Sequence, residues 1–298
     1  MRKVLVAALC VACLVMMSAL SFADQAAPIK APIKVSYVNK PLMADDSGIW
    51  KSAKANDVGL LAVEQSSYLG KGGIPAADKK KLQSNARYIF DLSGEVPAMS
   101  VKAVHNGKTI AIQVTWTDKT KNVENAIDSF RDSIALMFPI TASSGFNPSP
   151  LMGSKGEPVN IWQWRADWQA EKDGTRHLDV RQPQTDGVQV GMSDEILKSE
   201  FPGKPSKDAT LLDYVAEGYG TLTRLKDQPV KASGHYKDGK WTVVFLRDIN
   251  RASGSDAELL PGKNTFINVA VWNGQNNEVN GSKAISTVWI PLQIDAAK

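Results

Sequence analysis

Two hairpin patterns constrain the fold of this chain more than any other feature of its sequence. The run AMSVKAVHNGKTIAIQVTW (98–116) alternates apolar and polar residues on both sides of Asn106-Gly107, and the run 230–249 does the same around Asp238-Gly239. Asn-Gly and Asp-Gly pairs tolerate the positive φ angles of a two-residue hairpin turn. Each run therefore predicts two antiparallel strands.

Further strands are predicted where Val, Ile, Thr and Trp occupy alternating positions. These segments are 34–38, 133–138, 158–168, 187–192, 265–272 and 285–294. Helical patterns are few, with short helices expected at 76–86 and 208–217 and one or two turns at 123–130. Many short strands separated by Gly, Asn and Pro predict an all-β sandwich or barrel with a few short helices in inserted loops.

The first 23 residues have the pattern of a secretory signal peptide. Arg2 and Lys3 precede an apolar run over 4–20, and Ser21-Phe22-Ala23 has the small-x-small form of a cleavage site. The alternative is a retained membrane anchor, since the apolar run approaches the length of a membrane span. We expect cleavage, a single domain over 24–298 and no transmembrane anchor in the mature chain.

The cysteine and charge content of the expected mature chain excludes several functions. Both cysteines, Cys10 and Cys13, lie in the leader. Disulfides, cysteine-ligated iron–sulfur clusters, thiol nucleophiles and thioether-linked haem are therefore excluded from residues 24–298. Without the leader the net charge falls from +4 to +2, which is too balanced for a nucleic-acid-binding surface.

Hydrolytic and zinc chemistry find little support in the motifs. The three histidines, His105, His177 and His235, are scattered and lack the spacing of a zinc site. His105 and His235 adjoin the two hairpin turns, which predicts imidazoles that face the solvent. No glycine-rich phosphate loop precedes a helix, and no carboxylates stand out as an acid–base pair.

The stretch LMGSKGEPVNIWQWRADWQ (151–169) places Met152 just before a strand that is rich in tryptophan. Alternation predicts that Trp162, Trp164 and Trp168 lie on one face of this strand. On residue chemistry alone these tryptophans form either core or a ligand platform, and Met152 is a loop or core methionine. Lys283 directly precedes the last predicted strand, where a lysine is ordinarily exposed at the surface.

Four segments, FRDSIALMFPI, LMGSKGEPVNIWQWRADW, YKDGKWTVVFLRDI and GSKAISTVWIPL, together resemble the γ subunit of ethylbenzene dehydrogenase. Related subunits occur in dimethylsulfide dehydrogenase, in chlorate and selenate reductases and in nitrite oxidoreductases. The resemblance implies an immunoglobulin-like β-sandwich that binds one haem b non-covalently. It also implies a periplasmic complex with a molybdenum catalytic α subunit and an iron–sulfur β subunit. This chain would not itself be an enzyme but would exchange electrons with a soluble c-type cytochrome or similar carrier.

The same resemblance assigns the axial ligands of the haem iron. Met152 matches the methionine of a Met-Gly loop, and Lys283 matches the lysine just before the last strand. Met137 is the competing thioether, although its place within an alternating strand favours core packing. The haem propionates need cationic or hydrogen-bonding partners, for which the candidates are Arg131, Arg165, Lys155 and the indole N–H groups of Trp162 and Trp164. The long segment 170–230 departs from the family pattern.

A second hypothesis is a secreted carbohydrate-binding β-sandwich. Tryptophans on strands can stack on sugar rings, and similar sandwiches carry both functions. A third is a purely structural subunit that binds neither haem nor sugar. The haem hypothesis predicts a coloured protein, whereas the other two predict a colourless one.

Overall fold

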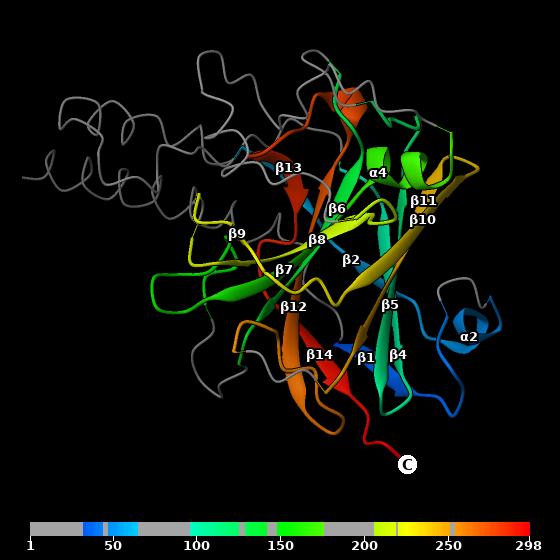
Figure 1. Cartoon of the computed structure of the whole chain (residues 1–298), viewed down its shortest axis with the longest axis vertical. Helices are drawn as coiled ribbons and strands as arrows, with labels where there is room; N and C mark the ends of the chain where they lie inside the picture. The colour runs from blue at the N-terminus through cyan, green and yellow to red at the C-terminus, as the bar shows by residue number, and fades with distance from the viewer. Residues whose placement is uncertain are drawn as a thin grey trace, which may run out of the picture.

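The computed structural model describes residues 32–43, 47–64, 96–124, 129–141, 148–175, 206–218, 220–250 and 254–298. Within these residues the chain forms two β-sheets packed face to face, with short helices at their edges (Figure 1). The expected leader, the strand expected at 187–192 and the helix expected at 76–86 lie outside the described residues. These three remain predictions.

The first sheet has the strand order β10-β11-β5-β4-β1-β14-β12, with β2 beside β4. Its strands are β1 (Ile33–Tyr37), β2 (Asn56–Val58), β4 (Met99–His105), β5 (Thr109–Thr117), β10 (Lys231–Lys237), β11 (Lys240–Asp248), β12 (Asn264–Trp272) and β14 (Ile290–Ile294). β1 runs parallel to both β4 and β14. The two predicted hairpins are confirmed as β4–β5 and β10–β11.

The second sheet continues from β12 through β6, β7 and β8 to β9. Its other strands are β3 (Leu61–Glu64), β6 (Ser133–Pro139), β7 (Val159–Arg165), β8 (Leu211–Ala216), β9 (Thr223–Arg224) and β13 (Ser282–Ile285). β12 belongs to both sheets, because its first half pairs with β14 and its second half pairs with β6 and β13. β3 pairs with β13 at the edge.

Short helices complete the fold. They are α2 (Ser47–Ser52), α4 (Ala166–Lys172) and the single 3-10 turn η3 (Gly274–Asn276). The predicted all-β sandwich with a few short helices is confirmed. Its immunoglobulin-like character is not confirmed by this strand order.

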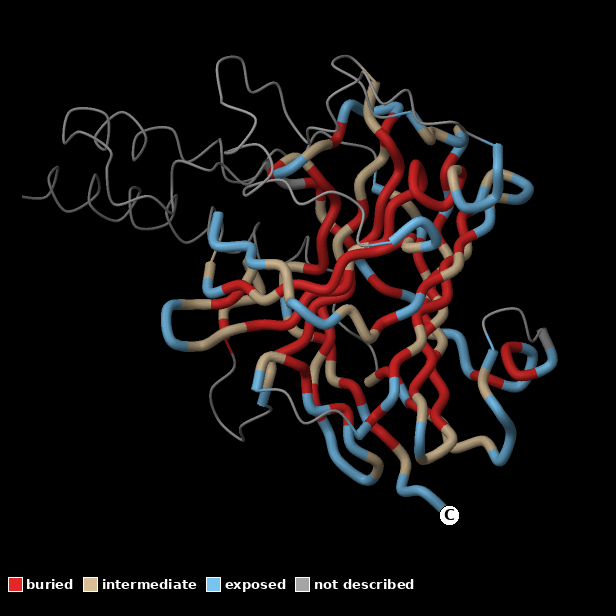
Figure 2. The backbone as a smooth tube through the Cα atoms, viewed as in Figure 1, coloured by how far each residue is buried: buried red, intermediate tan, exposed pale blue. Residues whose placement is uncertain are grey.

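The main core lies between the two sheets, and the buried positions follow the strands (Figure 2). Trp116, Trp164 and Trp241 meet in it, with ring centroids 6.2 Å apart for Trp116 and Trp241 and 5.0 Å apart for Trp164 and Trp241. Such aromatic pairs contribute about 1 kcal/mol each beyond the area they bury. The contacts between these indoles therefore hold β7 of the second sheet against β5 and β11 of the first.

Some predicted elements are wrong or misplaced. The helix predicted at 208–217 is the strand β8, because residues 211–216 pair with β7 and β9, and this tertiary pairing outweighs local propensity. The strand predicted at 158–168 ends at Arg165, where α4 begins. The strand predicted at 285–294 is divided into β13 and β14. Within 123–130, residues 123, 124, 129 and 130 are not helical, and the rest lie outside the described residues.

His105 does not face the solvent as predicted. It is fully buried, because β4 lies inside the first sheet between β1 and β5, and its ring packs edge-on against Tyr37 at 5.5 Å. Burial lowers the pKa of His105, against the opposing charge of Asp295. A turn-adjacent position therefore did not predict exposure, because the strand that precedes the turn is central in its sheet.

Replacing Gly234 with alanine is expected to destabilise the fold strongly. Gly234 lies on β10, and an added Cβ would overlap the ring of Trp164, which is fixed in the core. Overpacking of this kind costs about 1–3 kcal/mol or more. Urea unfolding would measure the loss, with Gly254→Ala as the control because a Cβ there meets nothing within 4 Å. Equal stability of the two variants would contradict this packing.

Candidate functional site

The second sheet carries an apolar cluster on the side that faces away from the main core. On β6, Ile134 and Leu136 point into the core, whereas Ala135 and Met137 point to the other side. We call this side the outer face. It consists of Ala135, Met137, Val159, Ile161, Trp168, Leu212, Tyr214 and Ala216, with Met152, Ala270, Trp272 and Trp289 partly buried against it.

Lys283 belongs to the outer face. In the register of β12 and β13, Ala284 pairs with Val271 and points into the core, so its neighbour Lys283 lies beside Trp272 on the other side. Its Nζ donates to the carbonyl oxygen of Asn280 (3.4 Å) and lies 5.3 Å from the centroid of the Trp272 ring. The residue is 5% exposed.

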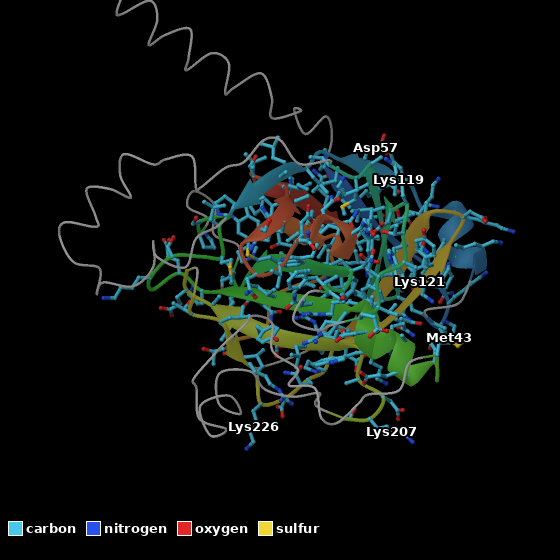
Figure 3. The ribbon with its side chains drawn as sticks, turned by 90° about the horizontal axis from the view of Figure 1, so that it is seen from above. Met43, Asp57, Lys119, Lys121, Lys207 and Lys226 are labelled. Carbon is cyan, nitrogen blue, oxygen red and sulfur yellow. The ribbon has the colours of Figure 1, made fainter. Side chains whose placement is uncertain are left out.

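This burial sets Lys283 apart from ordinary surface lysines. Lys207 and Lys226, for comparison, project into solvent at the rim of the molecule (Figure 3). The interpretation of Lys283 as a surface lysine at a strand start is therefore wrong. An amine placed on an apolar face indicates a specific role, because burying a charged group is costly.

Met152 lies in a tight loop that ends against the outer face. Met152 and Gly153 have φ angles of +77° and +85°, and a Cβ at Gly153 would come within 2.9 Å of the Ala216 carbonyl oxygen. The Met152 carbonyl accepts a hydrogen bond from the N–H of Gly218 (2.8 Å). A non-glycine residue in the left-handed region is uncommon and often marks a functional site. The structure thus explains why glycine follows this methionine.

Met137 lies on the same outer face, in the middle of β6. It is 6% exposed and pairs with Ile161 on one side and Asn268 on the other. The fold thus brings both candidate methionines and Lys283 to one side of the second sheet. It does not decide between the two thioethers.

Trp162 and Trp164 are not brought together with Met152 and Lys283. Both are fully buried in the main core, on the opposite side of β7. Their indole N–H groups donate to Asn160 Oδ1 (2.9 Å) and Gln169 Oε1 (3.3 Å). This placement favours a core role and leaves neither indole as a platform for a sugar ring.

Trp168 does not share a face with the other two tryptophans as predicted. The chain leaves β7 at Arg165 and turns into α4, which carries Trp168 to the outer face. The alternation rule fails here because the period of the chain changes from two to 3.6 at that point.

Arg131 and Arg165 lie at the border of the outer face. The guanidinium of Arg165 stacks 4.2 Å from the centroid of the Trp168 ring and donates to Asp167 Oδ2 at 2.7 Å. Arg131 Nε lies 3.3 Å from Asp167 Oδ1. Both arginines are buried and share this carboxylate. The fold therefore places two cations beside Trp168, close to the site that the sequence predicts.

Other residues of the outer face were missed by the sequence reasoning. Trp272 and Trp289 are partly buried in it, and Tyr214 continues it onto β8. Trp272 is the last residue of the strand predicted at 265–272. Which residue of the neighbouring strand pairs with it depends on the register, which the sequence does not show. Tyr214 lay in a segment interpreted as a helix.

A separate pair of buried carboxyl groups, Asp118 and Asp132, lies where β5 ends and β6 begins. Asp132 accepts hydrogen bonds from Trp241 Nε1 (2.8 Å) and from the N–H groups of Asn122 (2.7 Å) and Gly274 (3.0 Å). Burial and then the charge of Asp118 raise the pKa of Asp132 to about 7, although these hydrogen bonds oppose the shift. In the part of the chain that the structure describes, no three His, Cys, Asp or Glu side chains are grouped to hold a metal ion.

The raised pKa of Asp132 predicts a pH-dependent stability. The folded state binds this proton more tightly than the unfolded state, whose Asp pKa is near 3.8. The resulting stabilisation is complete below that value and is lost as the pH rises to about 7, by at most about 1.4 kcal/mol per pH unit. Asp132→Asn should flatten the pH dependence of the unfolding free energy between pH 4 and 7. An unchanged slope would contradict the shift.

Comparison with known proteins places these residues in a family context. A protein-family model described as ethylbenzene dehydrogenase matches residues 47–284, a range that includes Met152 and Lys283. The γ subunit of chlorate reductase from Ideonella dechloratans is 24% identical over 197 residues, which is 65% of this chain and 64% of that protein. The γ subunit of dimethylsulfide dehydrogenase from Rhodovulum sulfidophilum is 27% identical over 198 residues, or 64% of this chain and 58% of that protein.

One further relative and a solved structure complete the comparison. A Haloferax mediterranei protein, named as the heme subunit of a respiratory nitrate reductase, is 24% identical over 64% of this chain and 54% of its own length. The matches thus span between 54% and 64% of these three relatives. A solved family 9 carbohydrate-binding module from Caldicellulosiruptor kristjanssonii has 8% identity and a TM-score of 0.40, over 89% of this chain and 96% of that one. Likeness at that level is no guide to function.

Proposed function

Because the chain belongs to the ethylbenzene dehydrogenase family, we propose that it is the haem-binding γ subunit of a molybdenum oxidoreductase complex. In this proposal Met152 and Lys283 would hold the iron of one haem b, bound non-covalently at the outer face. The chain performs no substrate chemistry and relays electrons. The observation that carries the proposal is the burial of Lys283 on the apolar face that also receives Met152.

The residues of the outer face have the apolar character that a porphyrin site needs. Ala135 and Ala270 are paired neighbours on β6 and β12, and their small side chains leave room above the sheet at this point. Ile161 and Tyr214 are paired on β7 and β8, and they continue the apolar face onto these two strands. A flat macrocycle needs such a broad apolar surface with a few polar groups at its rim.

As an iron ligand, Lys283 would have to be a neutral amine. Lysine binds iron only without its extra proton. Burial disfavours the ammonium form and a metal ion competes with the proton, so both effects act in the required direction. The apolar stem of the side chain suits the wall of the sandwich.

The ligand pair determines what such a site does. When bound, the haem supplies reversible one-electron transfer. A thioether is a soft ligand that favours ferrous iron and raises the reduction potential. With both iron ligands supplied by this chain, the haem would serve electron transfer and would not bind oxygen or substrate.

Arg131 and Arg165 are proposed to attract the haem propionates. Their position beside Trp168, at the border of the outer face, supports this role. Trp162 and Trp164 have no such support, since their N–H groups donate inside the core.

The partners are proposed from the relatives. Two of them are γ subunits of a chlorate reductase and a dimethylsulfide dehydrogenase. We propose a molybdenum catalytic α subunit, an iron–sulfur β subunit and a soluble c-type cytochrome or similar carrier, with a periplasmic location after removal of residues 1–23. None of the helices among the described residues has the length and apolarity needed to span a membrane.

A visible spectrum of the purified chain is expected to show one low-spin haem. The ferrous form should give a sharp α band, and the pyridine haemochrome should be of b type and extractable with acidified solvent, because residues 24–298 contain no cysteine. Titration with haem should saturate at one equivalent. A chain that stays colourless after haem is supplied, but is retarded on a polysaccharide gel, would support the carbohydrate-binding alternative instead.

A further inference from the structure

We propose that Trp272 and Trp289 are positioning residues for the two haem ligands, each through its indole N–H group. Trp272 acts on the amine of Lys283, and Trp289 acts on the loop that carries Met152. The inference rests on the proposed haem site and deepens it, since neither tryptophan needs to touch the iron. Both are partly buried on the outer face, where Trp272 donates to the Asn280 carbonyl and Trp289 donates to the Pro148 carbonyl.

Trp272 and Lys283 share a single hydrogen-bond acceptor. The Asn280 carbonyl oxygen accepts the indole N–H of Trp272 (3.2 Å) and an N–H of Lys283 (3.4 Å). A carbonyl oxygen has two lone pairs and can accept both bonds. Asn280 has a φ angle of +51°, so a tight turn presents this carbonyl to both donors. The indole therefore orients the carbonyl, and the carbonyl orients the amine.

Trp289 fixes the methionine loop from the other end of the chain. Its indole N–H donates to the carbonyl oxygen of Pro148 at 2.6 Å, across 141 residues of sequence. The loop that follows is closed on itself, because the N–H of Gly153 donates to the Ser149 carbonyl (2.9 Å). Holding Pro148 thus holds the turn on which Met152 sits. Trp289 also packs against the outer face, as Met152 does.

Each tryptophan thus controls a different ligand. Groups that hydrogen-bond to a metal ligand, without touching the metal, set the orientation and basicity of that ligand. Their removal typically lowers metal affinity about 10- to 100-fold. A change at Trp289 should show in the properties of the sulfur ligand. A change at Trp272 should show in those of the amine.

The test compares Trp272→Phe and Trp289→Phe with the parent chain, all loaded with haem. Phenylalanine keeps an aromatic ring but removes the N–H donor. We expect haem to dissociate about 10- to 100-fold faster from both variants. We expect Trp289→Phe to weaken the sulfur-to-iron charge-transfer absorption of the ferric form and to lower the reduction potential. Trp272→Phe should keep that absorption and shift the magnetic resonance signal of the low-spin ferric haem.

Trp50→Phe is the matched control. Trp50 is buried on α2 against the far side of the first sheet, and its indole nitrogen has no hydrogen-bond partner among the described residues. This variant should match the parent in spectrum, potential and dissociation rate. Thermal unfolding of the haem-free chains shows whether each variant folds. As a measurement that needs no variant, the indole N–H of Trp289, whose hydrogen bond is partly buried, should exchange slowly with deuterium in the haem-loaded parent.

The outcomes separate this inference from the proposed function. If the parent binds haem through Lys283 but both tryptophan variants match Trp50→Phe, the inference alone is wrong. It is also wrong if both variants lose haem only in proportion to a lowered melting temperature, or if the indole N–H of Trp289 in the parent exchanges rapidly. If the parent binds no haem, the inference and the proposed function are both overturned.

Discussion

Lys283→Ala is expected to lower haem affinity by more than about 100-fold and to abolish the low-spin spectrum of whatever haem remains bound. Lys283 is 5% exposed on the outer face, and its amine donates a hydrogen bond to the Asn280 carbonyl. Alanine offers no atom that could bind iron. Loss of a direct ligand should lower haem affinity by more than the 10- to 100-fold that follows the loss of a group that only orients a ligand. Haem titration and visible spectroscopy measure both quantities.

The fold should survive this change. Most single substitutions cost about 0.5–3 kcal/mol, which is less than the total stability of a typical domain, and the core-facing neighbour Ala284 is retained. Lys34→Ala is the matched control, since Lys34 lies on a strand but is exposed and paired with Asp295 at 3.4 Å. It should leave haem binding unchanged. A Lys283→Ala chain with the affinity and spectrum of the parent would remove Lys283 from the site.

Met152→Leu is expected to convert the haem to a high-spin or mixed-spin form and to lower its reduction potential. Leucine keeps the volume and apolarity of methionine but has no sulfur, and thioether ligation raises the potential. Met137→Leu should change neither property, because a volume-conserving exchange in a packed strand costs less than about 1.5 kcal/mol. Redox titration and spectra of the two variants give the answer.

The two methionines serve as controls for each other. They lie on the same outer face, so the same substitution tests position rather than chemistry. Met152 has the left-handed backbone and the neighbouring glycine of a constrained loop, whereas Met137 is paired on both sides. If Met137→Leu alone changes the potential, Met137 is the ligand and the assignment of Met152 is wrong.

Much of the fold could be predicted because its strongest signals are local. The hairpins around Asn106-Gly107 and Asp238-Gly239 depend on turn chemistry and alternation within about 20 residues, and both are present. β8 was mistaken for a helix, since LLDYVA has no clear period and its pairing with β7 brings together residues about 50 positions apart. The turn from β7 into α4 likewise has no local marker that alternation detects.

The site was predicted only in part. The family resemblance identifies candidate residues, but the register of the paired strands determines which of them lie together. Met152 and Lys283 were named from the sequence, yet their common face follows from the order β13-β12-β6-β7. Trp162 and Trp164 stand beside Met152 in sequence but lie on the core side of β7. Trp289, distant in sequence, bonds the loop of Met152 directly. Closeness in sequence therefore did not predict which residues share the outer face. The pairing of the strands determines it.

The most direct test of the central claim is an experimental structure of the haem-loaded chain. The account predicts a flat macrocycle against the outer face, with its iron bonded to the sulfur of Met152 on one side and the side-chain nitrogen of Lys283 on the other. Iron held by any other pair of residues, or haem bound away from Ala135, Ile161 and Ala270, would contradict it.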